Sequence, residues 1–565
     1  MEQQVHSMPG KQSFLLTLLL FFFILFPPEI YNISYSIFYL LSALFFFASI
    51  YSISQIKISH SGIFLFSLVL FLIWSCFAKP LNLQYVLLFV TYGIYLLLLT
   101  NNDELAGTSL FLKGLLIVVI ITSVIAVYQY CYGFDAEYRK LLPLNNDFFI
   151  AKALAYLKFK RATSTFALPT VCSAFLSMSI PFLFLAFSIL KKFWKITAVI
   201  AGGLCLCALI LTKSFFIAPA CIIIVATGLF SRYLSFRKPI LYLLILGIVA
   251  GVSLTFMLRK DTSLHILKSQ TVSMRLGYWE VAGNMMRDHL LWGVGAGNFH
   301  IYYPHYMKAS TTETKYAHNL IAQLGAETGI MGMLAIIAGC MILIWRVFYG
   351  YYRRKITIEY WAYSTAALLF IAYSMIDISL YFPSIGFLGM VSISFFLKEY
   401  ARVFPEKSEA QVTCTYSLKI AAITLLTIYA IISANLHYNG TMLQRAYDQV
   451  KAGNDHDART TAQKYISYFP YDISSGILLL DISTRLPFIE DRLTLYNYIG
   501  SNFTESARLH YLIASQCMQD QLYFNGYVHY CTSPLLYPAK PVYQDACNKS
   551  EEFLNDYKRH YEKKP

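Results

Sequence analysis

Long apolar runs, separated by short polar stretches, fill the chain from residue 13 to residue 436. Their lengths approach the roughly 20 residues that a helix needs to cross a bilayer. The first run, 13–26, resembles a signal peptide, but Pro27-Pro28-Glu29 follows it without a small-residue cleavage motif, so we interpret it as an uncleaved span. Further runs bring the predicted number of spans to thirteen: about 34–53, 61–78, 83–100, 109–131, 166–190, 194–212, 214–231, 239–258, 329–348, 361–381, 384–398 and 416–436.

Basic residues between these runs occur in alternate loops, which sets the orientation. One set of loops carries Lys57 and basic clusters at 191–195, 232–238, 346–355 and 398–407. The positive-inside rule makes this set cytoplasmic, together with the N-terminus. With an odd number of spans the tail then ends outside.

The chain therefore divides into a transmembrane catalytic domain, 1–438, and an external tail domain, 439–565. Two long external loops, 132–165 and 259–328, belong to the transmembrane domain. Loops of this length are usually functional rather than simple connectors.

Composition supports the membrane assignment and narrows the function. The 565 residues are 57% hydrophobic and 13% charged, which excludes a water-soluble protein. The net charge of +14 is explained by cytoplasmic loops, and no nucleic-acid-binding motif accompanies it. We expect an all-α polytopic membrane protein that binds no nucleic acid.

The tail is charged and predicts a helical domain. Small and apolar residues mark two helices around Gly453, and Asp472 opens a third helical stretch, so a tetratricopeptide-like array is plausible although the period is not clean. No Cys/His spacing resembles a zinc site. If the compartment is oxidising, Cys531 pairs with Cys547 and leaves Cys517 free.

The stretch 316–332 carries the strongest candidate chemistry. His318 stands at the end of the second external loop, directly before an apolar run. Asn319 suits a helix N-cap, and Glu327 follows two turns later. A histidine at a membrane boundary can take a proton near pH 7, although a lone histidine beside a helix start is more often a polar cap.

Three cations, Arg161, Lys213 and Arg275, lie near span boundaries in the external set. Each one alone is more often a lipid-interface anchor. Together they suit a diphosphate, whose negative charge grows as it leaves. The absence of Asp-x-Asp or paired catalytic carboxylates argues against a metal-dependent glycosyltransferase and a retaining glycosidase, so no metal or cofactor is expected.

The second external loop offers two further patterns. Apolar positions between Arg275 and Met286 fit a helix lying at the membrane interface. The glycines of Gly293-x-Gly-x-Gly297 can bring backbone close to a ligand. A lone GxGxG without a strand or an acidic partner is weak evidence, so nucleotide binding is rejected.

His318-Asn-Leu followed by Glu327-x-Gly-x-x-Gly resembles the O-antigen ligase and protein O-oligosaccharyltransferase superfamily, the Wzy_C family. Arg275-x-x-x-Trp279 and the glycine loop match its next segment. The stretch from Arg161 to Pro169 resembles a further segment of the family pattern, with Ser164 in place of a glycine. At 211–215 the family's arginine is replaced by phenylalanine, so either Lys213 supplies that charge or one contact is lost.

Within the superfamily, the segment from Tyr373 to Tyr381 and the long tail are most similar to pilin-type O-oligosaccharyltransferases. The resemblance implies a GT-C-like fold in the bacterial inner membrane, with a periplasmic tail. It implies that His318 is the general base, that Arg161, Arg275 and Lys213 bind diphosphate, and that Asn319, Glu327, Trp279 and Tyr381 support the site.

The expected reaction is metal-independent, inverting transfer of a preassembled glycan from polyprenyl diphosphate to a Ser or Thr of a periplasmic protein such as pilin. Ligation to lipid A core and polymerisation of glycan units remain alternatives within the family. A lipid-linked glycan transporter is the alternative from another class. Transporters usually place charges inside spans, whereas here they gather in external loops.

Overall fold

The computed structural model describes residues 11–27, 35–50, 55–58, 82–101, 109–142, 154, 157–214, 217–230, 262–308, 313–377, 379–405, 410–413, 415–470 and 472–561. By their contacts the residues form two compact units. Unit 1 comprises Met1–Leu70, Leu87–His265 and Ala335–Ser433, and unit 2 comprises Phe71–Val86, Ile266–Leu334 and Ala434–Pro565. Each unit is built from segments that lie far apart in the sequence.

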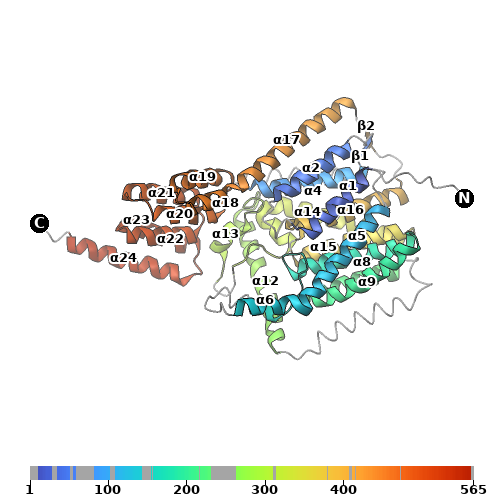
Figure 1. Ribbon diagram of the computed structural model, residues 1–565, viewed down its shortest axis with the longest axis horizontal. Coiled ribbons are helices and arrows are strands. Elements are labelled where there is room, and N and C mark those ends of the chain that lie inside the picture. The colour runs from blue at the N-terminus through green and yellow to red at the C-terminus, as the bar shows by residue number, and fades with distance from the viewer. Residues whose placement is uncertain are drawn as a thin grey trace. The chain divides into compact units, whose positions relative to one another are not determined.

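Unit 1 is built almost entirely from apolar helices. Neighbouring pairs include α1 with α5, α5 with α9, and α15 with α8 and α16 (Figure 1). In lipid every backbone N–H and C=O must be paired within the chain, which is why these sequences form continuous helices. The helices are α1 (Lys11–Leu25), α2 (Tyr35–Ile50), α4 (Leu83–Asn101), α5 (Ser109–Tyr128), α6 (Phe134–Leu141), α8 (Pro169–Ile189), α9 (Lys192–Leu211), α10 (Ile217–Phe230), α15 (Ile358–Ile376), α16 (Pro383–Val403) and α17 (Tyr416–Gly440).

Six helices of the described chain are long and apolar enough to cross a membrane, which confirms an all-α, multi-pass membrane protein. They are Leu83–Asn101, Ser109–Leu141, Pro169–Ile189, Lys192–Leu211, Leu320–Tyr352 and Tyr416–Lys451. Helices α1, α2, α10, α15 and α16, which are not among these six, coincide with further predicted spans. The predicted spans 61–78 and 239–258 lie outside the described residues, so the count of thirteen stays a prediction.

The helix that begins at Ser109 runs to Leu141, ten residues past the predicted end of that span. It contains a π-helical turn, η1 (Gln129–Gly133), before α6. The first part of the predicted loop 132–165 is therefore helical.

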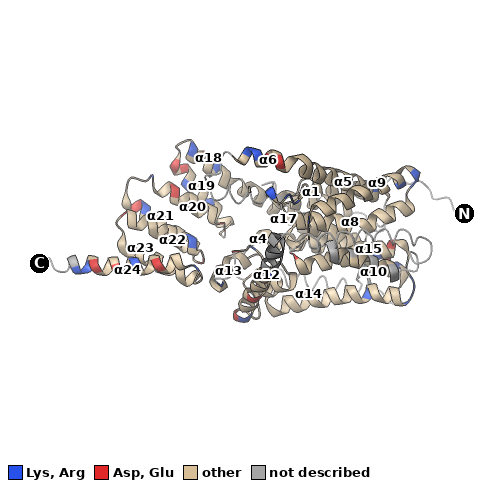
Figure 2. Cartoon of the chain, turned by 90° about the horizontal axis from the view of Figure 1, so that it is seen from below, with Lys and Arg blue, Asp and Glu red and all other residues tan. Residues whose placement is uncertain are grey.

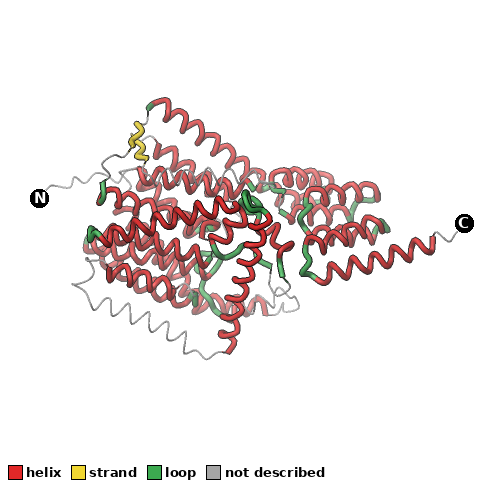
Figure 3. Tube along the Cα trace, turned by 180° about the vertical axis from the view of Figure 1, so that it is seen from behind, coloured by secondary structure: helices red, strands yellow, loops and turns green. Residues whose placement is uncertain are grey.

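One antiparallel strand pair accompanies the helices in the described chain (Figure 3). Strand β1 (Gln55–Ile58) pairs with β2 (Ala410–Thr413), with Gln55 opposite Thr413. Both strands lie in loops that the charge pattern assigns to the cytoplasmic side. Their pairing requires these two loops to share one side of the membrane, as that assignment demands; the orientation itself stays a prediction.

Unit 2 contains α12 (Thr262–Asp288), α13 (Phe299–Tyr306) and the start of α14 (Leu320–Tyr352). A small core joins them, in which Val281 and Met285 of α12 pack with Phe299 and Tyr303 of α13. The interfacial helix predicted between Arg275 and Met286 is present as part of α12, but its apolar residues do not all face lipid. Val281 and Met285 are buried in protein, whereas Leu276 is 56% exposed.

The tail is an array of helices in which each packs against the next. The helices are α18 (Met442–Lys451), α19 (Asp455–Tyr468), α20 (Ile473–Ser483), α21 (Ile489–Asn502), α22 (Ala507–Gln519), α23 (Tyr523–Leu536) and α24 (Pro541–Tyr561). Charged residues are frequent along them, whereas α5, α8 and α15 carry few (Figure 2).

The spacing of these tail helices is regular. Asp455, Ile489 and Tyr523 begin α19, α21 and α23 at intervals of 34 residues. Helices α20, α22 and α24 repeat the same interval. This is the period of tetratricopeptide repeats. The period is therefore cleaner than the residue pattern indicated, which supports the tetratricopeptide-like prediction.

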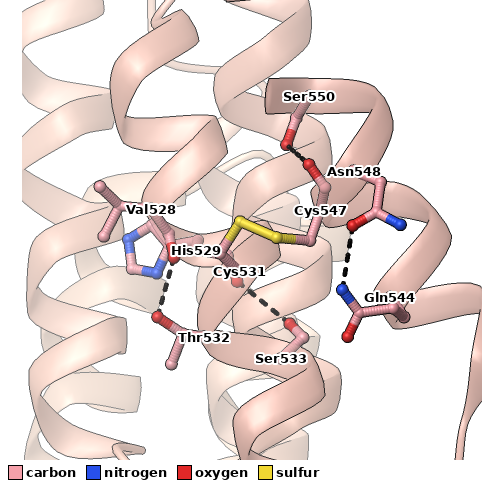
Figure 4. Close-up of a disulfide and its surroundings, with 9 residues drawn as sticks. All are labelled: Val528, His529, Cys531, Thr532, Ser533, Gln544, Cys547, Asn548 and Ser550. Carbon is pink, nitrogen blue, oxygen red and sulfur yellow. Dashed lines mark hydrogen bonds between the residues drawn. A yellow bond between two sulfur atoms is a disulfide. The ribbon is translucent and has the colours of Figure 1, made fainter. Parts of the chain in front are cut away.

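A disulfide joins the last two helices, between Cys531 on α23 and Cys547 on α24 (Figure 4). The predicted pairing is confirmed, and Cys517 is buried and free. Closing a loop of 16 residues in the unfolded chain contributes about 3 kcal/mol to stability in the chain-entropy model.

The tail also packs against the second external loop within unit 2. The Tyr537 hydroxyl donates a hydrogen bond to Glu313 Oε1 at 3.0 Å, and Lys540 Nζ lies 3.4 Å from the same oxygen. His305 Nδ1 is 3.0 Å from the Leu535 carbonyl oxygen. The loop thus shares a compact unit with the tail, although the sequence pattern assigned it to the transmembrane domain. The domain boundary at 438/439 stays a prediction.

Candidate active site

His318 occupies an unusual backbone conformation immediately before α14. Its φ is +51°, in the left-handed region that L-residues other than glycine seldom adopt. Such a conformation costs on the order of 1–3 kcal/mol and persists only where the surroundings impose it. The imidazole is partly buried, and its centroid lies 5.9 Å from that of the Tyr278 ring.

The peptide that precedes His318 is held from both sides. Trp279 Nε1 donates to the Ala317 carbonyl oxygen at 3.1 Å, and the Ala317 N–H donates to Gln323 Oε1 at 2.6 Å. Gln323 Nε2 in turn donates to Glu327 Oε1 at 2.7 Å. Gln323 and Glu327 are fully buried, so breaking either bond leaves a polar group without water to replace its partner. We call Trp279, Ala317, Gln323 and Glu327 the Ala317 clamp.

Asn319 performs the helix-capping role predicted for it. Its Oδ1 accepts a hydrogen bond from the Ala322 N–H at 3.0 Å, at the start of α14. Asn319, Gln323 and Glu327 are spaced four residues apart and therefore share one face of the helix. Sequence reasoning identified the first and last of these residues but missed Gln323, although the i, i+4 spacing was a usable signal.

Glu327 also connects α14 to α13. Its Oε1 accepts from the Phe299 N–H, in the first turn of α13, at 3.3 Å. The positive end of that helix therefore lies beside the carboxylate. Glu327 is a buried structural acceptor that links two helices to the peptide preceding His318.

The glycine loop packs against α14 rather than opening toward a ligand. The Val294 and Gly295 N–H groups donate to the carbonyl oxygens of Ala326 and Glu327, both at 2.9 Å. Gly293 has φ +68°, and a Cβ there would lie 2.3 Å from the Glu327 backbone. We expected these glycines to bring the backbone close to a ligand. In the structure the loop instead makes close contact with α14.

A kink in α14 explains why those carbonyl groups are available. Gly329 has φ +70° and ψ −169°, which interrupts the helical hydrogen bonds. The Ile330 N–H donates instead to the Leu290 carbonyl oxygen at 2.8 Å. The backbone groups released by the kink are thus paired with the segment that follows α12.

Arg275 and Trp279 lie four residues apart on α12, so their side chains leave the same face of the helix. Trp279 bonds to the Ala317 carbonyl oxygen, and Arg275 lies one helical turn before Trp279 on α12. Arg275 is partly buried and Trp279 is 38% exposed. Unit 2 therefore contains both the His318 imidazole and the permanent cation of Arg275.

His300 is a second histidine in this unit. Burial, followed by the positive charge of Lys315, lowers its pKa to about 4. A histidine with such a pKa is a poor proton acceptor at neutral pH. His300 is therefore not a candidate base.

Arg161 and Lys213 come together in unit 1. The Ala162 N–H donates to the Leu211 carbonyl oxygen at 3.0 Å, which joins the two segments. Arg161 Nε donates to the Thr212 carbonyl oxygen at 3.3 Å, and Lys213 Nζ donates to that of Phe159 at 2.8 Å. Phe215, the position where the family pattern has arginine, lies outside the described residues.

Gln129 fastens the loop that follows Arg161, and sequence reasoning missed it. Its Oε1 accepts from the Ser164 N–H at 2.7 Å, and its Nε2 donates to the Ser164 carbonyl oxygen at 2.8 Å. Ser164 has φ +55°, which accounts for the glycine of the family pattern at this position. Gln129 begins the π-helical turn, a feature frequent at functional sites.

Tyr381 is also in unit 1, in a 3-10 turn (Ser379–Tyr381). Its side chain is fully buried, and its ring meets that of Phe89 edge to face at 5.7 Å. Its carbonyl oxygen accepts from the Tyr35 hydroxyl at 3.2 Å. The predicted site residues therefore form two groups: Arg161, Lys213 and Tyr381 in unit 1, and Arg275, Trp279, His318, Asn319 and Glu327 in unit 2.

A comparison with protein-family models gives one match, over residues 196–337, to the family described as O-antigen ligase. The matched segment contains Lys213, Arg275 and His318, but neither Arg161 nor the tail. A search of curated proteins finds no match. The resemblance to the O-antigen ligase (Wzy_C) family is therefore confirmed over residues 196–337 of this multi-pass membrane protein, whereas the closer likeness to pilin-type enzymes stays a prediction.

Proposed function

We propose that this protein transfers a preassembled glycan from polyprenyl diphosphate to a Ser or Thr hydroxyl of a periplasmic protein such as pilin. The family match supports glycan transfer in a membrane setting. The observation that carries the assignment of the catalytic group is the left-handed conformation of His318, next to the Ala317 clamp. Backbone strain imposed by a buried polar network is a feature of functional sites.

In the proposed reaction, an imidazole nitrogen of His318 removes the proton of the acceptor hydroxyl. The hydroxyl oxygen forms a bond to the anomeric carbon of the glycan as the bond from that carbon to the diphosphate oxygen breaks. The electron pair of the broken bond stays with the polyprenyl diphosphate. Displacement from the opposite face inverts the anomeric configuration.

The three cations act on the departing diphosphate. Arg275 lies in the same unit as the base, and Arg161 and Lys213 form a second basic group. Guanidinium groups bind phosphate oxygens through paired hydrogen bonds, and the interaction strengthens as charge develops on the leaving group. The proposal requires no metal ion and no cofactor.

The tail provides a surface for a folded acceptor. It is a regular helical array, and arrays of this kind present extended binding surfaces. Because Tyr537 and Lys540 also contact Glu313 in the second external loop, removing the whole tail would disturb that loop as well. The intact protein therefore gives the cleaner test of acceptor binding: KM should be at least about tenfold lower for the folded acceptor than for its excised peptide.

Ligation of glycan to lipid A core is the second candidate, because the matching family model is described as O-antigen ligase. The donor and the chemistry are the same, and only the hydroxyl differs. A lipid-bound acceptor approaches along the bilayer and does not require the tail surface.

The deciding experiment uses the purified full-length protein in lipid nanodiscs with a polyprenyl-diphosphate-linked glycan. Either a periplasmic pilin or lipid A core is supplied, and the mass of each acceptor is measured. We expect a mass increase equal to the glycan on the pilin and none on lipid A core. Lys191→Ala, which changes an exposed lysine between α8 and α9, should leave transfer unchanged. Mass gained only by lipid A core would replace the protein acceptor with the ligase function.

A further inference from the structure

The turn after α12 exposes three apolar side chains in succession. Leu290, Leu291 and Trp292 are 48%, 56% and 48% exposed. Met331 and Leu334, just beyond the kink in α14, are 54% and 51% exposed. Water-exposed turns seldom carry such a run of large apolar residues, and contiguous apolar surface usually marks an interaction site.

The backbone of the turn is fixed against that of α14. The Ile330 N–H donates to the Leu290 carbonyl oxygen at 2.8 Å. A Cβ placed on Gly329 would lie 2.5 Å from the Leu291 carbonyl oxygen, so only glycine permits this approach. The turn and the residues after the kink are therefore neighbours, and we call Leu290, Leu291, Trp292, Met331 and Leu334 the kink patch.

We infer that the kink patch is embedded in the outer leaflet of the bilayer and anchors the second external loop in lipid. The helix that contains Met331 and Leu334 is among the candidate membrane spans, with a mean hydropathy of 2.2. The turn is bonded to Ile330, next to the kink in that helix, and therefore lies at the same depth as the residues just beyond the kink. Tryptophan is enriched at the boundary between hydrocarbon and head groups, which suits Trp292.

This placement differs from the topology predicted by the charge pattern, which puts residues 259–328 wholly outside. It makes the segment around Leu290 to Trp292 part of the membrane-embedded protein. Arg287, three residues before Leu290, has a highly exposed side chain and can extend toward lipid phosphates. The bilayer lipids of the outer leaflet are therefore the partner of the patch.

The effect of this anchor on the candidate active site rests on the proposed function. Val294 and Gly295 connect the segment after the turn to Ala326 and Glu327, at one end of the Ala317 clamp. Eleven residues separate His318 from Gly329, which at a helical rise of 1.5 Å per residue is about 16 Å. Anchoring the patch thus keeps His318 within that distance of the outer leaflet, where a lipid diphosphate lies.

The test uses the quenching of Trp292 fluorescence in the full-length protein. Wild type and Trp292→Phe are reconstituted in phosphatidylcholine–phosphatidylglycerol nanodiscs, with or without lipids brominated near the head group. The difference between the two spectra isolates Trp292. We expect brominated lipid to reduce this difference signal at least twofold and acrylamide in the aqueous phase to reduce it little. The same subtraction with Trp361→Phe, for a tryptophan that is 1% exposed, should give a signal insensitive to brominated lipid.

A second variant tests the lipid anchor without changing Trp292. Leu291→Asp should lower the thermal unfolding temperature in nanodiscs, whereas Leu535→Asp, at a tail residue that is 71% exposed, should leave it unchanged. Efficient acrylamide quenching without bromine quenching would overturn the inference. Bromine quenching that disappears when polyprenyl phosphate is added would assign the patch to the donor chain and also overturn it. These readouts need no glycan transfer, so they stand or fall independently of the proposed reaction.

Discussion

Ser164 in unit 1 and His318 in unit 2 share a backbone conformation, with φ of +55° and +51°. Each lies beside a peptide that a glutamine side chain holds, Gln129 in the first case and Gln323 in the second. The side chains differ. The Ser164 hydroxyl is turned inward and donates to the Thr122 carbonyl oxygen at 2.6 Å, whereas the His318 ring is partly exposed next to Tyr278.

The strained backbone at Ser164 holds segments of the fold together, whereas we propose that the strained backbone at His318 positions a functional side chain. At Ser164 the hydroxyl and both peptide groups are used within the protein, so glycine can perform the backbone task. At His318 the fixing contacts are made by the neighbouring peptide of Ala317, and the imidazole is partly exposed. Lys213 offers a third case: with φ +48° it follows the end of α9, where left-handed residues commonly terminate helices.

The largest difference between the two units should appear at their arginines. Arg275→Ala should reduce transfer from the lipid-linked donor about 10²–10³-fold, because it removes a cation grouped with the base. Arg161→Ala should cost about tenfold, because Arg161 Nε is already bonded to Thr212 within the protein. Steady-state rates at varied donor concentration give both values.

Arg275→Lys is the matched control, since it keeps the charge but loses the paired contact to phosphate. Its activity should fall between wild type and Arg275→Ala. Equal activity of all three proteins would make Arg275 an interfacial anchor.

The next largest difference in activity between the two units is expected at Gln129 and Gln323. Gln323→Leu should lower kcat about 10–10²-fold with little change in KM, because His318 loses its fixed position while donor binding is unaffected. Gln129→Leu should lower the unfolding temperature and change kcat less than about threefold, because it fastens a loop rather than the base. Kinetics and thermal unfolding of both variants separate these effects, and equal losses of kcat would abolish the distinction between the two units.

Acid should weaken unit 2 through a histidine pair in the tail. His510 and His529 stack with their Nδ1 atoms 2.7 Å apart. Burial, followed by the charge of His529, lowers the pKa of His510 to about 4, and burial also lowers that of His529. A folded pKa below the unfolded value near 6.5 gives stability that is complete above pH 6.5 and is lost as the pH falls toward 4.

For His510 alone this loss amounts to roughly 3 kcal/mol below pH 4 and about 2 kcal/mol at pH 5. Thermal unfolding of the tail can be monitored by limited proteolysis of the full-length protein at pH 7.5 and pH 5. The loss of stability should appear as unfolding at a lower temperature at pH 5. His510→Leu should flatten the pH dependence. A tail equally resistant at both pH values in the wild type would rule out this contribution.

The smallest effect is expected at Ser164. Ser164→Gly relieves the left-handed conformation but removes the hydrogen bond to Thr122, and the two terms, each about 1 kcal/mol, nearly cancel. Transfer should stay within about twofold of wild type. A tenfold loss would show that the serine hydroxyl has a role in the reaction that its buried contacts do not indicate.

Much of this arrangement was predictable because it depends on local pattern. Apolar runs predicted the helices, and Asn319 the cap of α14. The pairing of Cys531 with Cys547 was expected only on the condition of an oxidising compartment, and no sequence pattern required it. Gln129 was not predicted, because its contact with Ser164 spans 35 residues and glutamine alone carries no pattern. Gln323 was missed although its four-residue spacing from Asn319 and Glu327 was a usable signal. The glycine loop was misinterpreted because close approach to a helix and close approach to a ligand demand the same residue.

The central claim is that His318 is the base for glycan transfer, and single-turnover transfer by His318→Ala tests it most directly. Purified wild type and variant are compared in nanodiscs with saturating lipid-linked glycan and acceptor, and the glycosylated acceptor is quantified by mass spectrometry. Loss of a general base should slow the chemical step about 10²–10⁴-fold while donor binding and thermal unfolding stay unchanged. A variant that folds normally and transfers at the wild-type rate would remove His318 from the reaction.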